Sequence, residues 1–228
     1  MRLYLASTSP ARLATLRAAG IEPILCSSGV DEEAAVAAAG PLSAPEMVLL
    51  LARLKAEAVV GRLVDGEPLD GFVLGGDSVF ELDGVTYGKP HLASIARERW
   101  MAQRGREGQL HSGHWLIDAR ASSLPELAPL PEPAPLPEPV EGRRAVGGVS
   151  TTSVRFAASI TDAEIDAYVA TGEPLEVAGA FTIDSLGGAF ISEVHGDSHA
   201  VVGLSLALVR ELLLEFDVSW PTLWNRSL

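Results

Sequence analysis

Hydroxyls and a guanidinium lie close together in the segment Ser7-Thr8-Ser9-Pro10-Ala11-Arg12 near the N-terminus. The segment follows a short apolar run, and a Ser before Pro is typical of a helix start. Helix N-termini bind phosphate because free backbone N–H groups and the positive end of the dipole meet there, and an Arg adds a forked pair of donors. Ordinary helix capping uses the same residue types, and the signature of a P-loop is absent. The segment alone leaves both interpretations open.

Asp77 is the carboxylate whose position suggests catalysis. It follows the apolar run Phe72–Leu74 and two glycines, Gly75 and Gly76. Open α/β sheets place ligand-facing groups at the carboxyl ends of buried strands, and glycines let a ligand approach the backbone. An Asp after a strand can equally form a turn. Its own segment therefore does not decide between a base and a turn residue.

Three acidic residues, Asp31-Glu32-Glu33, form the next candidate group. Carboxylates can ligate a hard divalent cation through oxygen, but the same cluster is also typical of a solvated helix start. Lys55 lies in a helical pattern and Lys89 lies between Gly88 and Pro90. Composition does not separate these two lysines from surface lysines.

The charge balance limits the classes of partner. Thirty Asp and Glu residues against 17 Lys and Arg give a net charge of −13. Duplex binding by phosphate neutralisation needs the opposite sign, so we expect no nucleic acid polymer as a partner. A small phosphorylated ligand is compatible with this charge if a few local cations bind it.

The compartment is predicted from two features. The N-terminal apolar run Leu3–Ala6 is too short for a signal peptide or a membrane span, and the single cysteine, Cys26, cannot form an internal disulfide. We therefore expect a cytoplasmic protein that does not bind a membrane.

The elements that must position these residues alternate between strands and helices. Apolar runs predict strands at 2–6, 21–26, 72–76 continuing through 79–82, 109–119 and 151–158, with a hairpin turn at Asp83-Gly84. Helical spacing and caps predict helices at 11–19, 43–62, 94–104, 161–169 and 200–216. Because hairpins occur among the alternating elements, the fold class is α/β with a mixed sheet and flanking helices.

One stretch differs in composition from the rest. Pro-Glu and Leu-Pro units repeat from Leu124 to Pro139, which favours an extended, poorly packed conformation. We interpret 121–149 as a proline-rich acidic insertion that forms a disordered or extended hairpin loop. The domain prediction is one domain over 1–228.

The candidate residues occur in an order that resembles one family. The matching segments are Leu5-Ala6-Ser7-x-Ser9-Pro10-x-Arg12, Val30-Asp31-Glu32, Lys55, Gly76-Asp77-Ser78-Val79, Gly88-Lys89-Pro90, Val154-Arg155-Phe156, 168–175, Ala178-Gly179-Ala180-Phe181 and Val201-Val202-Gly203-Leu204. In this order the chain resembles the Maf nucleotide pyrophosphatases from end to end, and only the insertion lies outside the match. Each segment is weak alone, but so many in register make chance improbable.

The resemblance implies a fold and a reaction. The fold is an elongated, two-lobed single domain around a mixed, twisted central sheet with a cleft, shared with the inosine-triphosphate pyrophosphatases. The reaction is metal-assisted attack of water on the α-phosphorus of a nucleoside triphosphate, which releases pyrophosphate and serves nucleotide-pool house-cleaning. Alternatives are an inosine or xanthosine triphosphate pyrophosphatase and, in another class, a nucleotide-binding regulator of septum formation.

The resemblance also implies roles for six residues. Asp77 matches the proton acceptor, and the triphosphate-binding positions match Ser7, Arg12, Lys55 and Lys89. Glu32 matches an acidic position of the same site, so Glu32 and Asp77 are the candidate ligands of Mg²⁺ or Mn²⁺. Dimers are common in the family, which makes a homodimer an expectation for this chain.

Some positions depart from the family pattern. Ala11 stands where many members have a second Arg, and Gly108 stands where they usually have His. Members known for thymidine and uridine triphosphates have Tyr and Gln where this chain has Phe181 and Asp184. The preferred base is therefore open.

Overall fold

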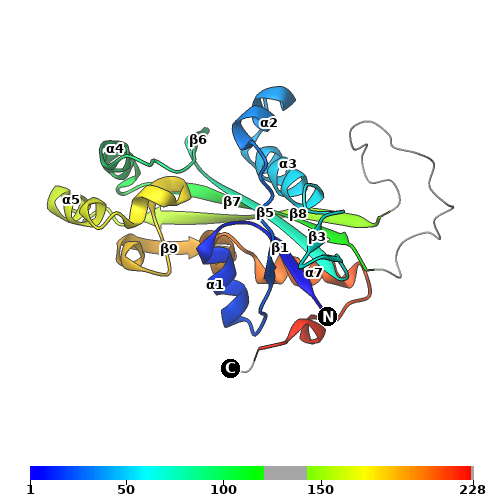
Figure 1. Cartoon of the computed structure of the whole chain (residues 1–228). Coiled ribbons are helices and arrows are strands. Elements are labelled where there is room, and N and C mark those ends of the chain that lie inside the picture. Colours follow the sequence, from blue (N-terminus) through cyan, green and yellow to red (C-terminus); the bar gives the residue numbers. More distant parts are fainter. Residues whose placement is uncertain (121–142, 227–228) are drawn as a thin grey trace.

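The computed structural model describes residues 1–120 and 143–226, which form a mixed sheet with helices on both faces (Figure 1). The strand order of the main sheet is β2-β1-β5-β7-β8-β9, and β6 also pairs with β5. Strand β1 is parallel to β2 and β5, whereas the remaining pairs are antiparallel. The predicted fold class, a mixed α/β sheet with flanking helices, is confirmed.

Three long strands form the axis of the molecule, and shorter strands extend it at the edges. The strands are β1 (Leu3–Ala6), β2 (Ile24–Leu25), β3 (Leu63–Val64), β4 (Glu67–Pro68), β5 (Phe72–Leu82), β6 (Val85–Tyr87), β7 (Glu107–Asp118), β8 (Ala145–Phe156) and β9 (Ile191–His195). Among the strands of the described ranges, β3 and β4 pair only with each other.

Seven α-helices cover the sheet, and short 3₁₀ turns fill the connections. The α-helices are α1 (Pro10–Ala18), α2 (Glu32–Ala39), α3 (Ala44–Glu57), α4 (Ala93–Gln103), α5 (Asp162–Ala170), α6 (Ser198–Val202) and α7 (Leu206–Leu214). The 3₁₀ helices are η2 (Glu173–Glu176), η3 (Ala178–Ala180), η4 (Leu186–Phe190) and η5 (Trp220–Leu223). These counts refer to the described residues.

The two largest clusters of buried side chains lie at opposite ends of the long strands, which gives the elongated shape of Figure 1 two lobes. In one lobe, Leu3, Phe72 and Leu74 pack against Leu213 and Phe216 of α7 and the turn after it. In the other, an aromatic cluster centres on Trp100, whose ring makes edge contacts with Phe156, Tyr168 and Phe190. Strands β5, β7 and β8 pass through both lobes and connect them.

Strand β5 corrects the expected position of Asp77. The prediction placed Asp77 at the carboxyl end of a strand, but β5 runs without a break from Phe72 to Leu82, so Asp77 lies in its middle. What ends near Asp77 is the neighbouring strand, because β1 pairs with β5 only as far as Ala6 and Gly75. The carboxylate is therefore level with the carboxyl end of β1 instead of its own strand.

One edge of β5 is open at the same point. Strand β7 pairs with β5 from Phe72 to Glu81, so β1 and β6 must share the opposite edge. On that edge β1 pairs through Gly75 and β6 begins at Phe80. Within the described parts of the chain, residues 76–79 have no strand partner there, which leaves backbone polar groups available beside Asp77.

Two glycines let helix α3 lie directly on the sheet. A Cβ atom on Gly75 would come within 2.0 Å of the carbonyl oxygen of Ala52, and one on Gly113 within 2.4 Å of that of Val48. Real Cβ contacts are never so short, so any larger residue would force the helix away. The close approach is what brings Lys55, one turn after Ala52, down to Asp77.

The predicted helix over 200–216 is wrong in its continuity. It divides into α6 and α7 around Gly203, whose φ of 111° lies in the left-handed region, and the side chain of Ser205 then accepts from the N–H of Leu208 to begin α7. Gly ends helices in this conformation because it has no Cβ to clash. The apolar pattern continued across the break, so periodicity alone did not reveal it.

Other boundaries also shifted. The predicted helix 43–62 ends at Glu57, and the strand expected at 21–26 is reduced to Ile24 and Leu25. The C-terminal limit of the insertion predicted over 121–149 is wrong, because β8 begins at Ala145 and pairs in register with β7. Residues 121–142 lie outside the described residues. No helix in the described ranges has the length and apolarity needed to cross a membrane.

Candidate functional site

The centre of the site is the ammonium group of Lys55, which lies between two carboxylates. Its Nζ is 2.7 Å from Oδ1 of Asp77 and 2.8 Å from Oε1 of Glu32. The Lys55 and Asp77 side chains are 9% and 13% exposed, whereas that of Glu32 is 51% exposed. One cation on α3 therefore joins a buried carboxylate on β5 to an accessible one on α2.

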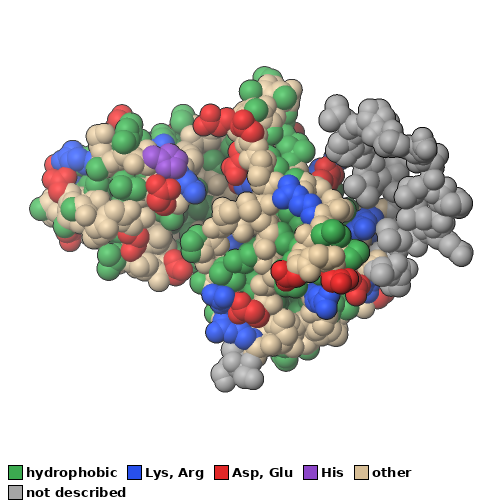
Figure 2. Space-filling view, in the orientation of Figure 1, with side chains coloured by type: hydrophobic (Ala, Val, Ile, Leu, Met, Phe, Trp, Pro, Cys, Tyr) green, Lys and Arg blue, Asp and Glu red, His purple; other side chains and the backbone are tan. Residues whose placement is uncertain are grey.

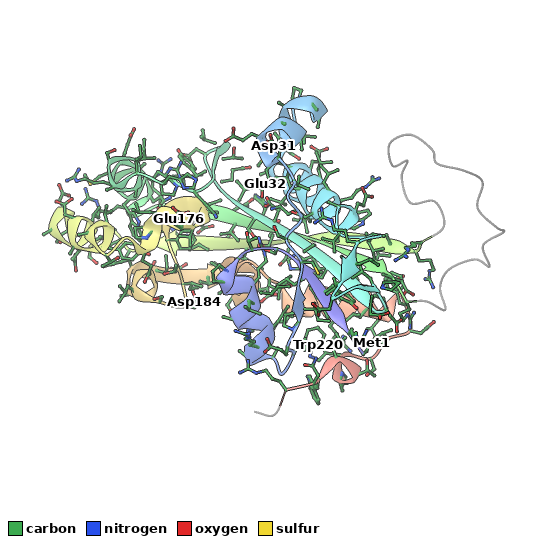
Figure 3. All side chains as sticks on the ribbon, in the orientation of Figure 1. Met1, Asp31, Glu32, Glu176, Asp184 and Trp220 are labelled. Carbon is green, nitrogen blue, oxygen red and sulfur yellow. The ribbon has the colours of Figure 1, made fainter. Side chains whose placement is uncertain are left out.

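Glu32 reaches this position because α2 begins beside the sheet. The side chain of Asp31 caps the helix by accepting from the N–H of Ala34 at 3.0 Å, so Glu32 becomes its first residue. Figure 3 labels both residues at the start of α2, and Figure 2 shows acidic side chains gathered there beside a hollow in this face. The cluster is thus both a helix start, as one interpretation held, and part of the candidate site.

Burial and charge act in opposite directions on Asp77. Burial raises the pKa of the Asp77 carboxyl above its ordinary value, and Glu32 adds to the rise, while Lys55 and Arg12 oppose it. Removing a carboxylate from water disfavours its charged form, and nearby cations favour it. A raised pKa makes Asp77 a better proton acceptor than an ordinary Asp.

Arg12 lies on the other face of β5. Its Nε donates to the carbonyl oxygen of Gly203 at 2.8 Å, Nη1 donates to Oγ of Ser7 at 3.1 Å and Nη2 donates to Oγ of Ser78 at 2.9 Å. Burial lowers the pKa of the Arg12 guanidinium, with Asp77 and Glu32 opposing the change. An arginine remains charged at neutral pH, so Arg12 places a fixed positive charge beside the open edge.

Ser7 connects Arg12 to the start of α1. Its Oγ accepts from the N–H of Ser9 at 3.2 Å and from Arg12, while Ser9 caps the helix by accepting from the N–H of Arg12 at 3.4 Å. Since both acceptor positions of Ser7 are used, its hydroxyl proton is left for a ligand among the described groups. Capping and a phosphate-binding geometry therefore coexist in this segment.

Lys89 is not brought together with the other candidates. It is exposed in the connection between β6 and α4, and within the described residues it makes no hydrogen bond or ion pair. The structure thus joins Glu32, Lys55 and Asp77 in one contact group and Ser7 with Arg12 in another, while the sixth predicted residue is separate.

The carboxylates of the site suit Mg²⁺ or Mn²⁺ in an open site. Among the described residues, no three His, Cys, Asp or Glu side chains are grouped as a closed metal site. Mg²⁺ is commonly held by one or two carboxylates together with substrate phosphates and water. Glu32 and Asp77, which approach one Lys55 Nζ at 2.8 and 2.7 Å, fit that open type of site.

The positions that differ from the family pattern have clear surroundings. Phe181 is 4% exposed and packs against Phe80 and Phe156, with ring centroids 5.4 and 5.1 Å away, so its ring is part of the core. Asp184 is exposed on the same lobe (Figure 3). Gly108 is required by packing, because a Cβ atom there would lie 2.2 Å from the Phe80 ring.

The segment that carries Asp184 is held by Glu173. The Glu173 carboxylate accepts from the hydroxyls of Thr182 and Ser185 and from the N–H of Gly187 at 3.1 Å. Burial alone would raise the pKa of Glu173, but these hydrogen bonds outweigh it and lower the pKa to about 2. A charged Glu173 therefore stabilises this segment.

We expect Glu173→Gln to remove part of the acid sensitivity of folding. A carboxylate with a folded-state pKa of about 2, against 4.5 when unfolded, contributes stability above pH 4.5 that is lost as pH falls toward 2. Urea unfolding between pH 3 and pH 7 should show a shallower decline for this variant than for the wild type. The matched control is Glu176→Gln on the exposed neighbour; parallel curves for Glu173→Gln and wild type would contradict the prediction.

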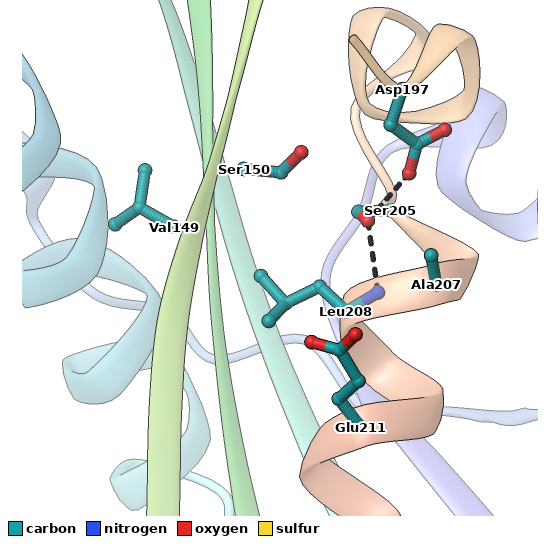
Figure 4. A pocket seen from close by; sticks show the side chains of 7 residues that line it. All are labelled: Val149, Ser150, Asp197, Ser205, Ala207, Leu208 and Glu211. Atoms are coloured by element: carbon teal, nitrogen blue, oxygen red, sulfur yellow. Dashed lines mark hydrogen bonds between the residues drawn. The ribbon is translucent and has the colours of Figure 1, made fainter.

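Two cavities of the described residues lie away from Asp77. One of about 230 Å³ is lined by Val149, Ser150, Asp197, Ser205, Ala207, Leu208 and Glu211, between β8 and the start of α7 (Figure 4). Another of about 270 Å³ lies beside Trp220 and Trp224. Neither includes a predicted site residue, and the candidate site is an open edge of the sheet.

Three residues of the site were missed as functional positions. Ser78, Ser112 and Gly203 form the hydrogen-bonded surroundings of Arg12. Ser78 and Gly203 both lie in segments that match the family pattern, and that match was the available signal. Ser112 comes into place only through the register of β5 and β7, which are separated by β6 and α4.

Known proteins resemble this chain over nearly its full length. The family described as Maf-like protein matches residues 2–216. The nucleoside triphosphate pyrophosphatase of Leifsonia xyli is 62% identical over 231 residues, which cover 100% of this chain and 98% of the relative. Those of Salinispora tropica and Mycobacterium sp. (strain JLS) are 49% and 45% identical, over 100% and 99% of this chain and 89% and 99% of theirs. The chain belongs to the Maf family.

Proposed function

We propose that this chain hydrolyses a nucleoside triphosphate to the monophosphate and pyrophosphate, as a house-cleaning enzyme of the nucleotide pool. The observation that carries the proposal is the Lys55 ammonium between Glu32 and Asp77, beside the open edge of β5 and across the strand from Arg12. Relatives that share nearly the full length of this chain are named nucleoside triphosphate pyrophosphatases, which supports it.

The cations of the site suit a triphosphate. The substrate carries roughly four negative charges, whose attraction to nearby cations is strong where water is excluded. Arg12 and Lys55 are both buried and place cationic side chains on opposite faces of β5. Together with the Ser7 hydroxyl they would bind phosphate oxygens. Lys89 is assigned to the same role on the family resemblance alone.

Asp77 is the proposed general base. Its Oδ1 accepts from Lys55, and no described residue donates to its second oxygen, which can accept a proton from the attacking water. The water oxygen then bonds to the α-phosphorus and the bond to the bridging oxygen breaks, which yields the monophosphate and pyrophosphate. Stabilisation of the charge that develops on the leaving group by Lys and Arg carries much of the rate.

Glu32 and Asp77 would hold the divalent cation, Mg²⁺ or Mn²⁺. When bound, the cation lowers the pKa of a water molecule and neutralises phosphate charge. Lys55 would then keep the two carboxylates in position. The expected cytoplasmic location and homodimer remain predictions.

A substrate panel tests the proposal. Wild-type protein with Mg²⁺ or Mn²⁺ should release pyrophosphate from at least one standard, methylated or deaminated nucleoside triphosphate, and EDTA should abolish the release. In H₂¹⁸O, attack at the α-phosphorus puts the label in the monophosphate, whereas attack at the β-phosphorus puts it in pyrophosphate. Mass spectrometry of the two products distinguishes these routes.

The alternatives give different results in the same panel. Exclusive hydrolysis of inosine and xanthosine triphosphates would favour a deaminated-purine pyrophosphatase. Nucleotide binding without pyrophosphate from any member would favour a binding regulator of septum formation and contradict the proposal. We expect catalysis because a pure binding module has little need of a buried carboxylate next to a lysine.

A further inference from the structure

We infer that Ser78 and Ser112 are positioning residues that fix the guanidinium of Arg12 for the triphosphate. The inference rests on the proposed function and extends it to two residues that do not touch the reacting atoms. It depends on a chain of hydrogen bonds that runs from Arg12 across β5 and β7 to helix α6.

The direction of every bond in this chain is determined. Ser112 Oγ donates to the carbonyl oxygen of Ala200 at 2.7 Å, which uses its single proton. In the 2.8 Å contact between the two hydroxyls Ser78 must therefore be the donor. Ser78 then has lone pairs but no proton left, so it can only accept from Arg12 Nη2, at 2.9 Å. A hydroxyl fixed as an acceptor is complementary to a cation.

Helix α6 holds this row of hydrogen bonds at two points. Ala200, in the middle of α6, accepts from Ser112, and Gly203, which follows its last residue, accepts from Arg12 Nε. The carbonyl groups at a helix C-terminus carry partial negative charge, which favours a guanidinium there. Gly203 can present its carbonyl in this way because its φ of 111° suits only glycine.

The remaining donors of Arg12 are arranged for a ligand. A guanidinium has five N–H groups, and the described residues accept three of them, one each from Nε, Nη1 and Nη2. Each terminal nitrogen therefore keeps one N–H. Two such donors in one plane match two oxygens of a phosphate, provided that the plane is held. Ser78 fixes the Nη2 side of that plane.

Because Asp77 and Ser78 are adjacent, the hydrogen bonds that hold Arg12 also relate its position to that of the proposed base, Asp77. Successive side chains of a strand point to opposite faces, and here Asp77 meets Lys55 of α3 while Ser78 meets Arg12 of α1. The two residues share one strand, so fixing Arg12 on Ser78 also fixes its position relative to Asp77. Loss of the Ser78 hydroxyl should therefore affect triphosphate binding more than proton transfer.

The test compares two variants of the same position. With the triphosphate that the wild type hydrolyses best, Ser78→Ala should raise KM about tenfold, which corresponds to one hydrogen bond to a charged group, and lower kcat by less than about threefold. Ser78→Thr keeps the hydroxyl and should restore KM to near the wild-type value. Because Ser112 acts through Ser78, the double variant Ser78→Ala/Ser112→Ala should have the KM of Ser78→Ala alone.

Thr152→Val is the matched control. Thr152 is buried, and its hydroxyl bonds the backbone of Asp197 just before α6 at 3.0 Å without touching Arg12. This variant should lower the melting temperature and leave KM unchanged. An unchanged KM in Ser78→Ala, or a KM raised equally in the Ser78→Thr or Thr152→Val variants, overturns the inference. Failure of the wild type to release pyrophosphate would instead overturn the proposed function.

Discussion

Replacing Asp77 with Asn should lower kcat about 10³-fold, within the range known for removal of a general base, while nucleotide binding is retained. Asn has nearly the same shape, so it fits the space on β5 and can still accept a hydrogen bond from Lys55. Its amide cannot take a proton from water. Steady-state kinetics gives the loss of kcat, and calorimetry with a non-hydrolysable triphosphate analogue gives the affinity.

The control for this variant is another Asp-to-Asn change outside the site. Asp166 on α5 forms an exposed ion pair with Arg97, and its side chain is 56% exposed. Asp166→Asn should retain full activity. If Asp77→Asn turns over substrate at the wild-type rate, Asp77 is not the base. If it loses affinity in proportion to rate, the carboxylate serves binding instead of proton transfer.

The sequence predicted those parts of the fold that depend on local signals. The capping box that begins α5 and the turn at Asp83-Gly84 were found because each consists of neighbouring residues. The break between α6 and α7 was missed because Gly203 lies in an apolar pattern that continues on both sides. The hydrogen bond from Arg12 to its carbonyl oxygen joins residues 191 positions apart, which local patterns do not reveal.

The site also depends on contacts between distant segments, which local sequence patterns do not predict. Asp77 was expected at a strand end because it comes directly after the apolar run Phe72–Leu74 and two glycines. In the fold Gly75 lies under α3, so the strand continues. Local chemistry could not predict that the end of β1 would supply the opening beside Asp77. The family resemblance placed Asp77 in a site that single-segment reasoning did not reach.

The arrangement explains how an acidic chain can bind an anion. The net charge is −13, yet the buried groups at the open edge of β5 include two cations, Lys55 and Arg12. A charge excluded from water acts more strongly on a nearby phosphate than exposed charges screened by salt. The positive electrostatic field of the site can therefore oppose the negative field of the whole protein.

Lys55→Met should destabilise the protein and abolish most of its activity. Methionine has a similar length, but it leaves the buried Asp77 carboxylate without the cation that lies 2.7 Å away. Breaking a buried ion pair in this way costs about 3–5 kcal/mol of unfolding free energy. Without Lys55 the pKa of Asp77 should rise further, because Lys55 is the largest influence that lowers it. Urea unfolding and pyrophosphate release measure the two losses.

A double variant separates these two effects. In Lys55→Met/Asp77→Asn no charge is left buried without its partner, so part of the lost stability should return, while activity stays absent because both base and cation are gone. The control Arg53→Met removes an exposed partner of Glu57 on the same helix and should cost less than about 1 kcal/mol. If Lys55→Met is no less stable than Arg53→Met, the contact with Asp77 does not stabilise the fold. Stability recovered in the double variant would show that the loss in Lys55→Met comes from the buried Asp77 carboxylate left without its cation.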